Sequence, residues 1–107
     1  MTHQNYFVYI ATNPDRHTVL YIGVTSDLER RGNEHSTGRG GGFSRQYNAH
    51  KVIFFETFPD AESAIARETQ LKKRSRAKKE ALIAAQNPEW RDLIAETHVS
   101  PSSGGSR

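Results

Sequence analysis

The stretch YFVYIATNPDRHTVLYIGVT, residues 6–25, decides the fold that this sequence predicts. Its two ends, residues 6–11 and 19–24, are short and rich in β-branched and aromatic residues, a composition typical of β-strands. Asparagine, proline and aspartate at positions 13–15 separate the two ends, and this combination favours a turn. Two strands joined by a turn predict a β-hairpin.

The predicted hairpin contains two tyrosines that can face each other. If the turn is centred on Asp15, Tyr9 lies directly opposite Tyr21, and opposed side chains project from the same face with Cβ atoms about 5 Å apart. A β-bulge would shift this register by one residue. Opposed strand tyrosines are most often core aromatics, and the alternative is a pair whose hydroxyls work together. The hairpin alone leaves both interpretations open.

The rest of the chain predicts one more strand and several helices. Ser26 with Glu29 forms a capping box at the start of the first helix, and Asp60 is the expected N-cap of the second. Asn87 followed by Pro88 is expected to start a last short helix. The predicted elements are a strand over residues 51–58, helices over about residues 27–37, 61–74 and 76–86, a short helix from residue 88, and a glycine-rich loop over residues 38–47.

Composition limits the class of protein. The 107 residues are enough for one domain. The absence of cysteine excludes disulfides, thiolate catalysis and cysteine zinc sites. No apolar run approaches the roughly 20 residues of a membrane span, and the N-terminus lacks the pattern of a signal peptide. We therefore expect a cytoplasmic protein without membrane association.

The positive charge is concentrated in one segment. The net charge of the chain is only +3, yet the run KKRSRAKK holds six cations in eight residues and no anion. A solvated helix face is the ordinary explanation of such a run, and a phosphate-binding surface is the alternative. The six cations are Lys72, Lys73, Arg74, Arg76, Lys78 and Lys79.

One carboxylate falls where an apolar residue is expected. The apolar stripe of the helix over residues 61–74 comprises Ala61, Ala64, Ile65 and Leu71, and Glu68 lies in the middle of it. A buried carboxylate costs several kcal/mol unless it meets a cation. The candidates are a metal ion and Arg31, which with Leu28 and His35 shares one face of the first helix.

With these residues in order, the sequence resembles the small stand-alone bacterial type of GIY-YIG domain. The first signature element corresponds to FVY at residues 7–9, and the second to YIG at residues 21–23. The later stretches AIARE, LKK and NPEWRDL also resemble that group, so the resemblance covers about residues 5–94. It implies an α/β fold with a central three-stranded antiparallel sheet flanked by helices. We expect the domain to span residues 1–96 and residues 97–107 to form a disordered tail.

The resemblance also implies a function and a set of site residues. The function is that of a metal-dependent endonuclease, a hydrolase that cleaves phosphodiester bonds of DNA with one Mg²⁺ or Mn²⁺ ion; DNA repair or recombination is the expected setting. Nucleic acid, most of all DNA, is the expected partner. Carried over by position, the catalytic residues are Tyr9, Tyr21, Arg31 and His35, Glu68 is the metal ligand, and Asn87 lies near the site. Arg39 and Arg45 of the glycine-rich loop join the six cations of the basic run as expected nucleic-acid contacts.

Three departures from the family pattern favour an alternative. Phe7 replaces the glycine that names the first element, Val24 stands where some branches have lysine, and Gly32 weakens the first helix by about 1 kcal/mol relative to alanine. The alternative is a catalytically weak nucleic-acid-binding module that keeps the fold. A small structural or interaction protein is a third class, but it leaves the carboxylate of Glu68 unexplained.

Overall fold

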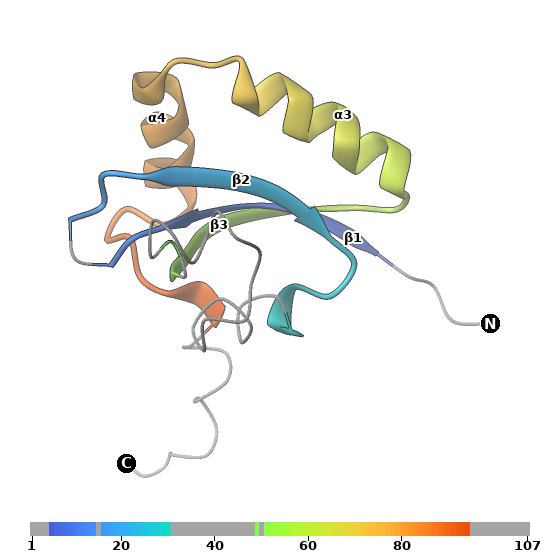
Figure 1. The fold of residues 1–107 in the computed structure, drawn as a ribbon, viewed down its shortest axis with the longest axis horizontal. Coiled ribbons are helices and arrows are strands. Elements are labelled where there is room, and N and C mark those ends of the chain that lie inside the picture. The colour runs from blue at the N-terminus through green and yellow to red at the C-terminus, as the bar shows by residue number, and fades with distance from the viewer. Residues whose placement is uncertain (1–4, 15, 31–48, 50, 95–107) are drawn as a thin grey trace, which may run out of the picture.

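The computed structural model describes residues 5–14, 16–30, 49 and 51–94. Its elements are the strands β1 (Tyr6–Thr12), β2 (Leu20–Thr25) and β3 (Lys51–Phe58) and the helices α3 (Ala61–Lys72) and α4 (Arg76–Gln86), drawn in Figure 1. The three predicted strands and the two helices after them are confirmed to within two residues at each end. The glycine-rich loop, most of the first predicted helix and the tail lie outside the described residues.

The strands form one antiparallel sheet in the order β2-β1-β3. This confirms the central three-stranded antiparallel sheet and the hairpin. The register is different from the one expected, because Tyr9 pairs with Gly23, and Tyr21 pairs with Ala11. The shift is two residues, an even number, so both tyrosines still project from the same face.

The turn itself explains this shift. The side-chain oxygen of Asn13 accepts a hydrogen bond from the backbone N–H of Val19 at 2.8 Å, and its backbone carbonyl accepts from His17 at 3.0 Å. His17 has a positive φ of 55°, which reverses the chain direction late in the loop. The loop is therefore held from Asn13 to Val19, and its centre lies beyond Asp15.

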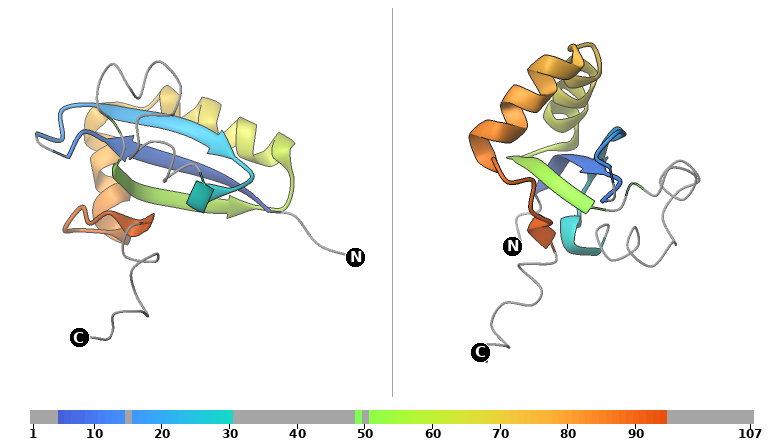
Figure 2. Two further views of the ribbon diagram at one scale, coloured as in Figure 1. Left: turned by 60° about the horizontal axis from the view of Figure 1, so that its bottom comes forward. Right: turned by 90° about the vertical axis from the view of Figure 1, so that its left-hand side faces the viewer.

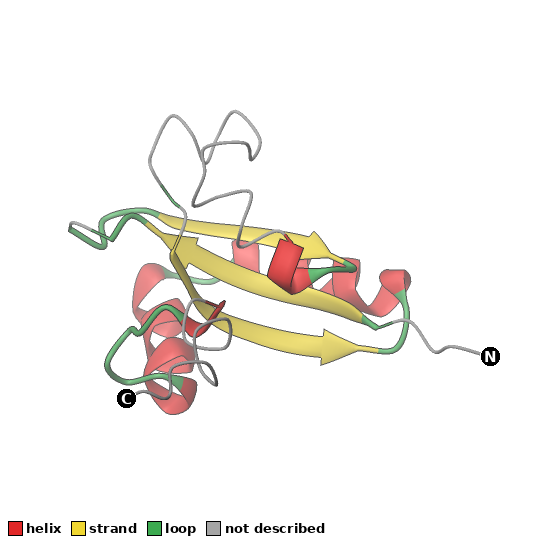
Figure 3. Ribbon diagram, turned by 90° about the horizontal axis from the view of Figure 1, so that it is seen from below, coloured by secondary structure: helices red, strands yellow, loops and turns green. Residues whose placement is uncertain are grey.

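The two faces of the sheet are covered differently. α3 and α4 lie on the same side of the sheet, as Figures 1 and 2 show. Viewed from the other side, the strands lie in front of both helices (Figure 3). The helix-covered core contains Val8, Ile10, Ile22, Ile53, Phe54, Ala64, Leu71 and Ile83. A second cluster contains Tyr9, Ala11, Leu28, Val52 and Ile94, so the alternation of β1 divides the core into two.

Side-chain caps define the starts of the helices. Asp60 accepts a hydrogen bond from Ser63 N–H at 2.7 Å, which confirms it as the N-cap of α3, and Ser75 caps α4. The expected cap at Ser26 is wrong by one residue. Asp27 accepts from Arg30 N–H at 3.0 Å, because the Thr25 hydroxyl accepts from Asp27 N–H and sets the entry to the helix one position later.

The expected helix from Pro88 is also wrong. Residues 88–89 form a turn. Between the end of α4 and residue 94, helical geometry appears only at residues 93–94. The carboxamide of Asn87 bonds both the N–H and the carbonyl of Arg91, and Trp90 has a positive φ of 55°. A positive φ is incompatible with a right-handed helix at this point, so the segment closes on the Asn87 side chain instead.

The inward stripe of α3 is narrower than expected. Ala64 and Leu71 are fully buried, but Ile65 is 51% exposed and lies outside the stripe. Glu68 falls between Ala64 and Leu71 at spacings of four and three residues, so it shares their side of the helix. None of the helices in the described ranges has the length and apolar character needed to cross a membrane.

Candidate functional site

The two tyrosines lie side by side on the sheet face that α3 and α4 do not cover. Their ring centroids are 6.1 Å apart, and the ring planes make an angle of 53°. Tyr9 is 1% exposed, whereas Tyr21 is only partly buried. β1 and β2 therefore present one enclosed and one more accessible phenol at neighbouring positions.

Gly23 makes room for the end of the Tyr9 side chain. A Cβ atom at this glycine would lie 2.6 Å from the Tyr9 hydroxyl oxygen and 2.8 Å from Cζ, both closer than van der Waals contact. The Tyr9 ring thus lies across the backbone of β2, directly against its cross-strand partner. The third residue of the YIG element is needed for space, because a larger residue would push the phenol away.

Among the described residues, Glu68 has Lys72 as its cationic partner. Its side chain is 21% exposed, and Lys72 Nζ lies 3.1 Å from its Oε2. α3 packs against the face that carries Val8 and Ile10, so the sheet separates the body of this helix from the Tyr9 ring. α3 and Tyr21 approach each other instead at the edge strand β2, where Lys72 and Tyr21 line one pocket.

A pocket joins these parts at that edge. We call it the β2-edge pocket; its volume is about 320 Å³, and its lining residues are Leu20, Tyr21, Ile22, Lys72 and Lys79. Lys72 is also the ion-pair partner of Glu68, although Glu68 is not itself among the lining residues. Tyr21 from the sheet and two cations from the helices meet here.

The donor set for a metal ion is sparse in the described part of the chain. It contains no group of three or more histidine and acidic side chains that would hold an ion. Glu68 supplies one carboxylate, a hard oxygen ligand of the kind that Mg²⁺ and Mn²⁺ prefer. A single carboxylate that already attracts a cation fits an ion held mostly by water and substrate oxygens.

Four of the expected site residues belong to the segment between β2 and β3. Arg31, His35, Arg39 and Arg45 lie outside the described residues. An ion pair between Arg31 and Glu68, which one of the two interpretations of Glu68 requires, stays a prediction.

Asn87 lies within the described residues, and its side-chain amide stabilises the fold through hydrogen bonds to the backbone. It is 4% exposed; Nδ2 donates to the carbonyls of Ile53 and Arg91, each at 2.9 Å, and Oδ1 accepts from Arg91 N–H at 3.0 Å. The side chain ties the segment after α4 to β3. The structure does not bring Asn87 to the β2-edge pocket.

The basic run divides into three groups. Lys72 and Lys79 line the β2-edge pocket. A second depression at the corner between α3 and α4, which we call the corner hollow, has a volume of about 660 Å³; its lining residues are Ala66, Thr69, Gln70, Lys73, Arg74, Ser75 and Lys78. Arg76 belongs to neither.

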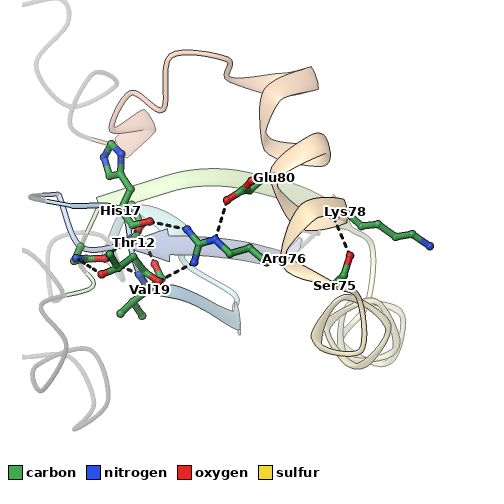
Figure 4. Close-up of polar contacts among 9 residues, drawn as sticks. Thr12, His17, Val19, Ser75, Arg76, Lys78 and Glu80 are labelled. Carbon is green, nitrogen blue, oxygen red and sulfur yellow. Dashed lines mark hydrogen bonds and ion pairs between the residues drawn. The ribbon is translucent and has the colours of Figure 1, made fainter.

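Arg76 holds the β1–β2 turn. Its Nη1 donates to the carbonyl of Thr18 at 2.7 Å and its Nη2 to that of His17 at 2.6 Å, while Nε pairs with Glu80 Oε2 at 2.8 Å (Figure 4). The guanidinium fork matches two neighbouring carbonyl groups, a geometry that lysine cannot reproduce. One cation of the predicted phosphate-binding run is therefore engaged within the protein.

His17 is a turn residue that the sequence did not single out. Its ring lies 4.9 Å from the ring of Trp90, and its Nε2 is 3.1 Å from Lys51 Nζ. Burial, and secondarily the charge of Lys51, lower the pKa of His17 below its ordinary value. A histidine in a turn gives no signal in the sequence, because these partners come from β3 and from the segment after α4.

Comparisons with known proteins show the family and agree with the fold. Residues 5–81 match the GIY-YIG catalytic domain. The UPF0213 protein NP_0776A of Natronomonas pharaonis is 36% identical over 80 residues, which cover 75% of this chain and 92% of that protein. The UPF0213 protein SpyM50708 of Streptococcus pyogenes is 32% identical over 90 residues, 83% of this chain and 96% of that protein. The solution NMR structure of the UPF0213 protein BH0048 from Bacillus halodurans superposes with a TM-score of 0.52 at 29% identity, over 90% of this chain and 97% of that one.

Proposed function

The chain belongs to the GIY-YIG catalytic domain family, a family of nucleases, and from this membership we propose that it is a metal-dependent endonuclease acting on DNA. The observation that carries the proposal is the pairing of Tyr9 and Tyr21 on one sheet face, with Lys72, the ion-pair partner of Glu68, lining the same pocket as Tyr21 at the edge of β2. DNA repair or recombination is the setting we expect for such an activity in the cytoplasm.

Hydrolysis of a phosphodiester needs three contributions. A nucleophile must be deprotonated, negative charge on the phosphoryl oxygens must be neutralised, and the leaving oxygen must be stabilised. A free phenol has a pKa of about 10, so a tyrosine that acts as a base near neutrality needs about 4 kcal/mol from nearby positive charge. We assign the base to Tyr9, whose enclosure limits exchange with water, and the orientation of the attacking water to Tyr21.

Glu68 is the residue we assign to a single Mg²⁺ or Mn²⁺ ion. Bound there, the ion supplies charge neutralisation and lowers the pKa of coordinated water. Glu68 has to exchange its partner for this, since Lys72 now lies 3.1 Å from its oxygen. Lys72, once released, remains at the β2-edge pocket, where a phosphate oxygen is the natural partner of its ammonium group.

One observation favours the weaker function, a nucleic-acid-binding module without appreciable cleavage. Phe7, at the position of the family glycine, packs edge to face against Phe55 with ring centroids 6.2 Å apart. This adds apolar bulk to the face that carries both tyrosines. The basic run serves either function, because phosphate contacts bind DNA whether or not it is cleaved.

The test is nicking of supercoiled plasmid by the purified protein in Mg²⁺, in Mn²⁺ and in EDTA. We expect relaxed product with either metal and none with EDTA. Tyr9→Phe, which keeps the ring, should lower the rate at least about a hundredfold, the scale of a lost general base. If the parent protein binds plasmid and never nicks it, the binding module is the correct function. If Tyr9→Phe and Tyr21→Phe both nick at the parental rate, the tyrosines are core aromatics.

A further inference from the structure

The β2-edge pocket has an unbalanced positive charge. Among the residues that the structure describes, the charged side chains in its lining are Lys72 and Lys79, and none of these lining residues is acidic. Glu68 offsets the charge of Lys72 at 3.1 Å. Lys79 is partly buried, and no carboxylate among the described residues forms an ion pair with its ammonium group. A partly desolvated ammonium without an anion is the less stable arrangement, so the pocket favours an anionic ligand.

The first turn of α4 increases this preference. It contains no acidic residue, and Arg76, Lys78 and Lys79 all lie within it. Cations at a helix N-terminus are opposed by the positive end of the helix dipole, where an anion is favoured. Of the three, Arg76 is the one that forms an ion pair with a carboxylate within the described ranges, that of Glu80.

Arg76 also explains why Lys79 lies beside β2. Through the carbonyls of His17 and Thr18 it ties the start of α4 to the turn that leads into β2. Lys79 follows Arg76 by three residues, so it projects from the same side of α4, next to Leu20 and Tyr21. Lys78 points the other way, away from the hairpin, in Figure 4.

We propose that the β2-edge pocket is a phosphate subsite beside Tyr21 and that Lys79 is the side chain that binds the phosphodiester there. The corner hollow with Lys73, Arg74 and Lys78 is then a separate surface, outside the reaction centre. This inference rests on the proposed function, since it assigns to Tyr21 a neighbouring substrate phosphate. It goes beyond that function in assigning Lys79 to the same pocket as Lys72 and in separating both from Lys73, Arg74 and Lys78 at the corner hollow.

Inorganic phosphate tests the subsite without any cleavage. We would titrate phosphate at constant ionic strength into the parent protein, Lys79→Ala and Lys78→Ala, and follow the backbone amide signals by NMR. In the parent and in Lys78→Ala, the amides of residues 20–22 should shift along one saturable curve. In Lys79→Ala the affinity should fall about tenfold or more, the scale of one charge-assisted contact. Equal curves in all three proteins, no shift at residues 20–22 in the parent, or shifts confined to the corner hollow would each overturn the proposal.

A DNA arm distinguishes a strand phosphodiester from free phosphate. Binding of a short single-stranded oligonucleotide in EDTA is measured over a range of salt concentrations. Lys79→Ala should reduce the slope of log K against log salt by about 0.7, the value of one phosphate contact on a single strand, and Lys79→Arg should restore it. An unchanged slope, together with a lost response to phosphate, would mean that the pocket takes free phosphate and would overturn the assignment to DNA.

The two proposals can fail separately. A parent protein that never nicks DNA but shows both effects of Lys79→Ala retains the subsite and loses the endonuclease. A parent that nicks DNA, with a Lys79→Ala variant of parental kcat/KM and parental salt slope, retains the endonuclease and loses the subsite. Alanine is the best helix former, so neither substitution threatens α4.

Discussion

Replacing Gly23 by alanine should destabilise the protein through one contact. The new Cβ would lie 2.6 Å from the Tyr9 hydroxyl oxygen and 3.1 Å from Cε2, whereas ordinary contacts begin near 3.4 Å. The end of the Tyr9 ring would have to move by about 0.8 Å, and this side chain is 1% exposed in a packed cluster. Overpacking of this kind costs about 1–3 kcal/mol.

The expected loss of stability on Gly23→Ala is opposite in sign to the intrinsic preference of a strand for alanine over glycine. A glycine within a strand is less stable than alanine by roughly 0.5–1 kcal/mol, so the same substitution at an open site would stabilise. Thermal denaturation measures the difference. A loss of 1–3 kcal/mol lowers the melting temperature of a domain of this size by about 4–20 °C.

A double-mutant cycle isolates the contact. Tyr9→Leu removes the end of the ring, so Gly23→Ala made in that background should be neutral or stabilising. The reasoning is refuted if Gly23→Ala lowers the melting temperature equally in both backgrounds. The steric account of the YIG glycine would then be wrong, and another neighbour would be responsible.

Three further outcomes are expected. Without metal, Glu68→Gln should change the melting temperature little, because the lost ion pair with Lys72 is half exposed and worth about 0.3–0.5 kcal/mol. Mg²⁺ should raise the melting temperature of the parent and not that of the variant. An equal rise in both proteins would place the ion elsewhere. Arg76→Ala should cost about 1–2 kcal/mol in thermal melts through its lost contacts to the turn, whereas Lys78→Ala stays within about 0.5; equal melts with a flatter salt slope for Arg76→Ala would make this arginine a DNA contact. The lowered pKa of His17 means that the unfolded chain takes up the proton first, so its contribution to stability is complete above about pH 6.5 and declines as the pH falls below that value. His17→Asn, which tolerates the positive φ, should flatten the fall of melting temperature between neutral and mildly acidic pH, and a parallel fall in both proteins would exclude this histidine as the cause.

Local pattern alone was enough for the elements and the family. The β-branched and aromatic residues of the two hairpin strands and the aspartate before α3 act within a few residues, so they predict the strands, the hairpin and the start of α3 directly. The motif spacing around Tyr9, Tyr21 and Glu68 pointed to the GIY-YIG family, which residues 5–81 match.

The register between β1 and β2 and the partners of individual side chains were decided only in the folded structure. The hydrogen bonds of Asn13 lengthen the turn and move Tyr9 opposite Gly23, and the same side-chain chemistry at Asn87 replaces the expected last helix. The pattern of one helix placed Ile65 in the core, but the width of the covered face left it exposed. At Asn13 and Asn87, a hydrogen bond between residues several positions apart outweighs a local preference worth only about 1 kcal/mol.

The basic run, residues 72–79, shows most clearly what the sequence alone leaves undetermined. In the sequence, Arg76, Lys78 and Lys79 are equivalent members of one charged segment. In the structure, the first holds the hairpin turn, the second lines the corner hollow and the third lines the β2-edge pocket. A helix turns its side chains by about 100° per residue, so neighbours in the chain face different surroundings. What each cation meets depends on which strand or turn packs beside α4, and only the folded chain determines that.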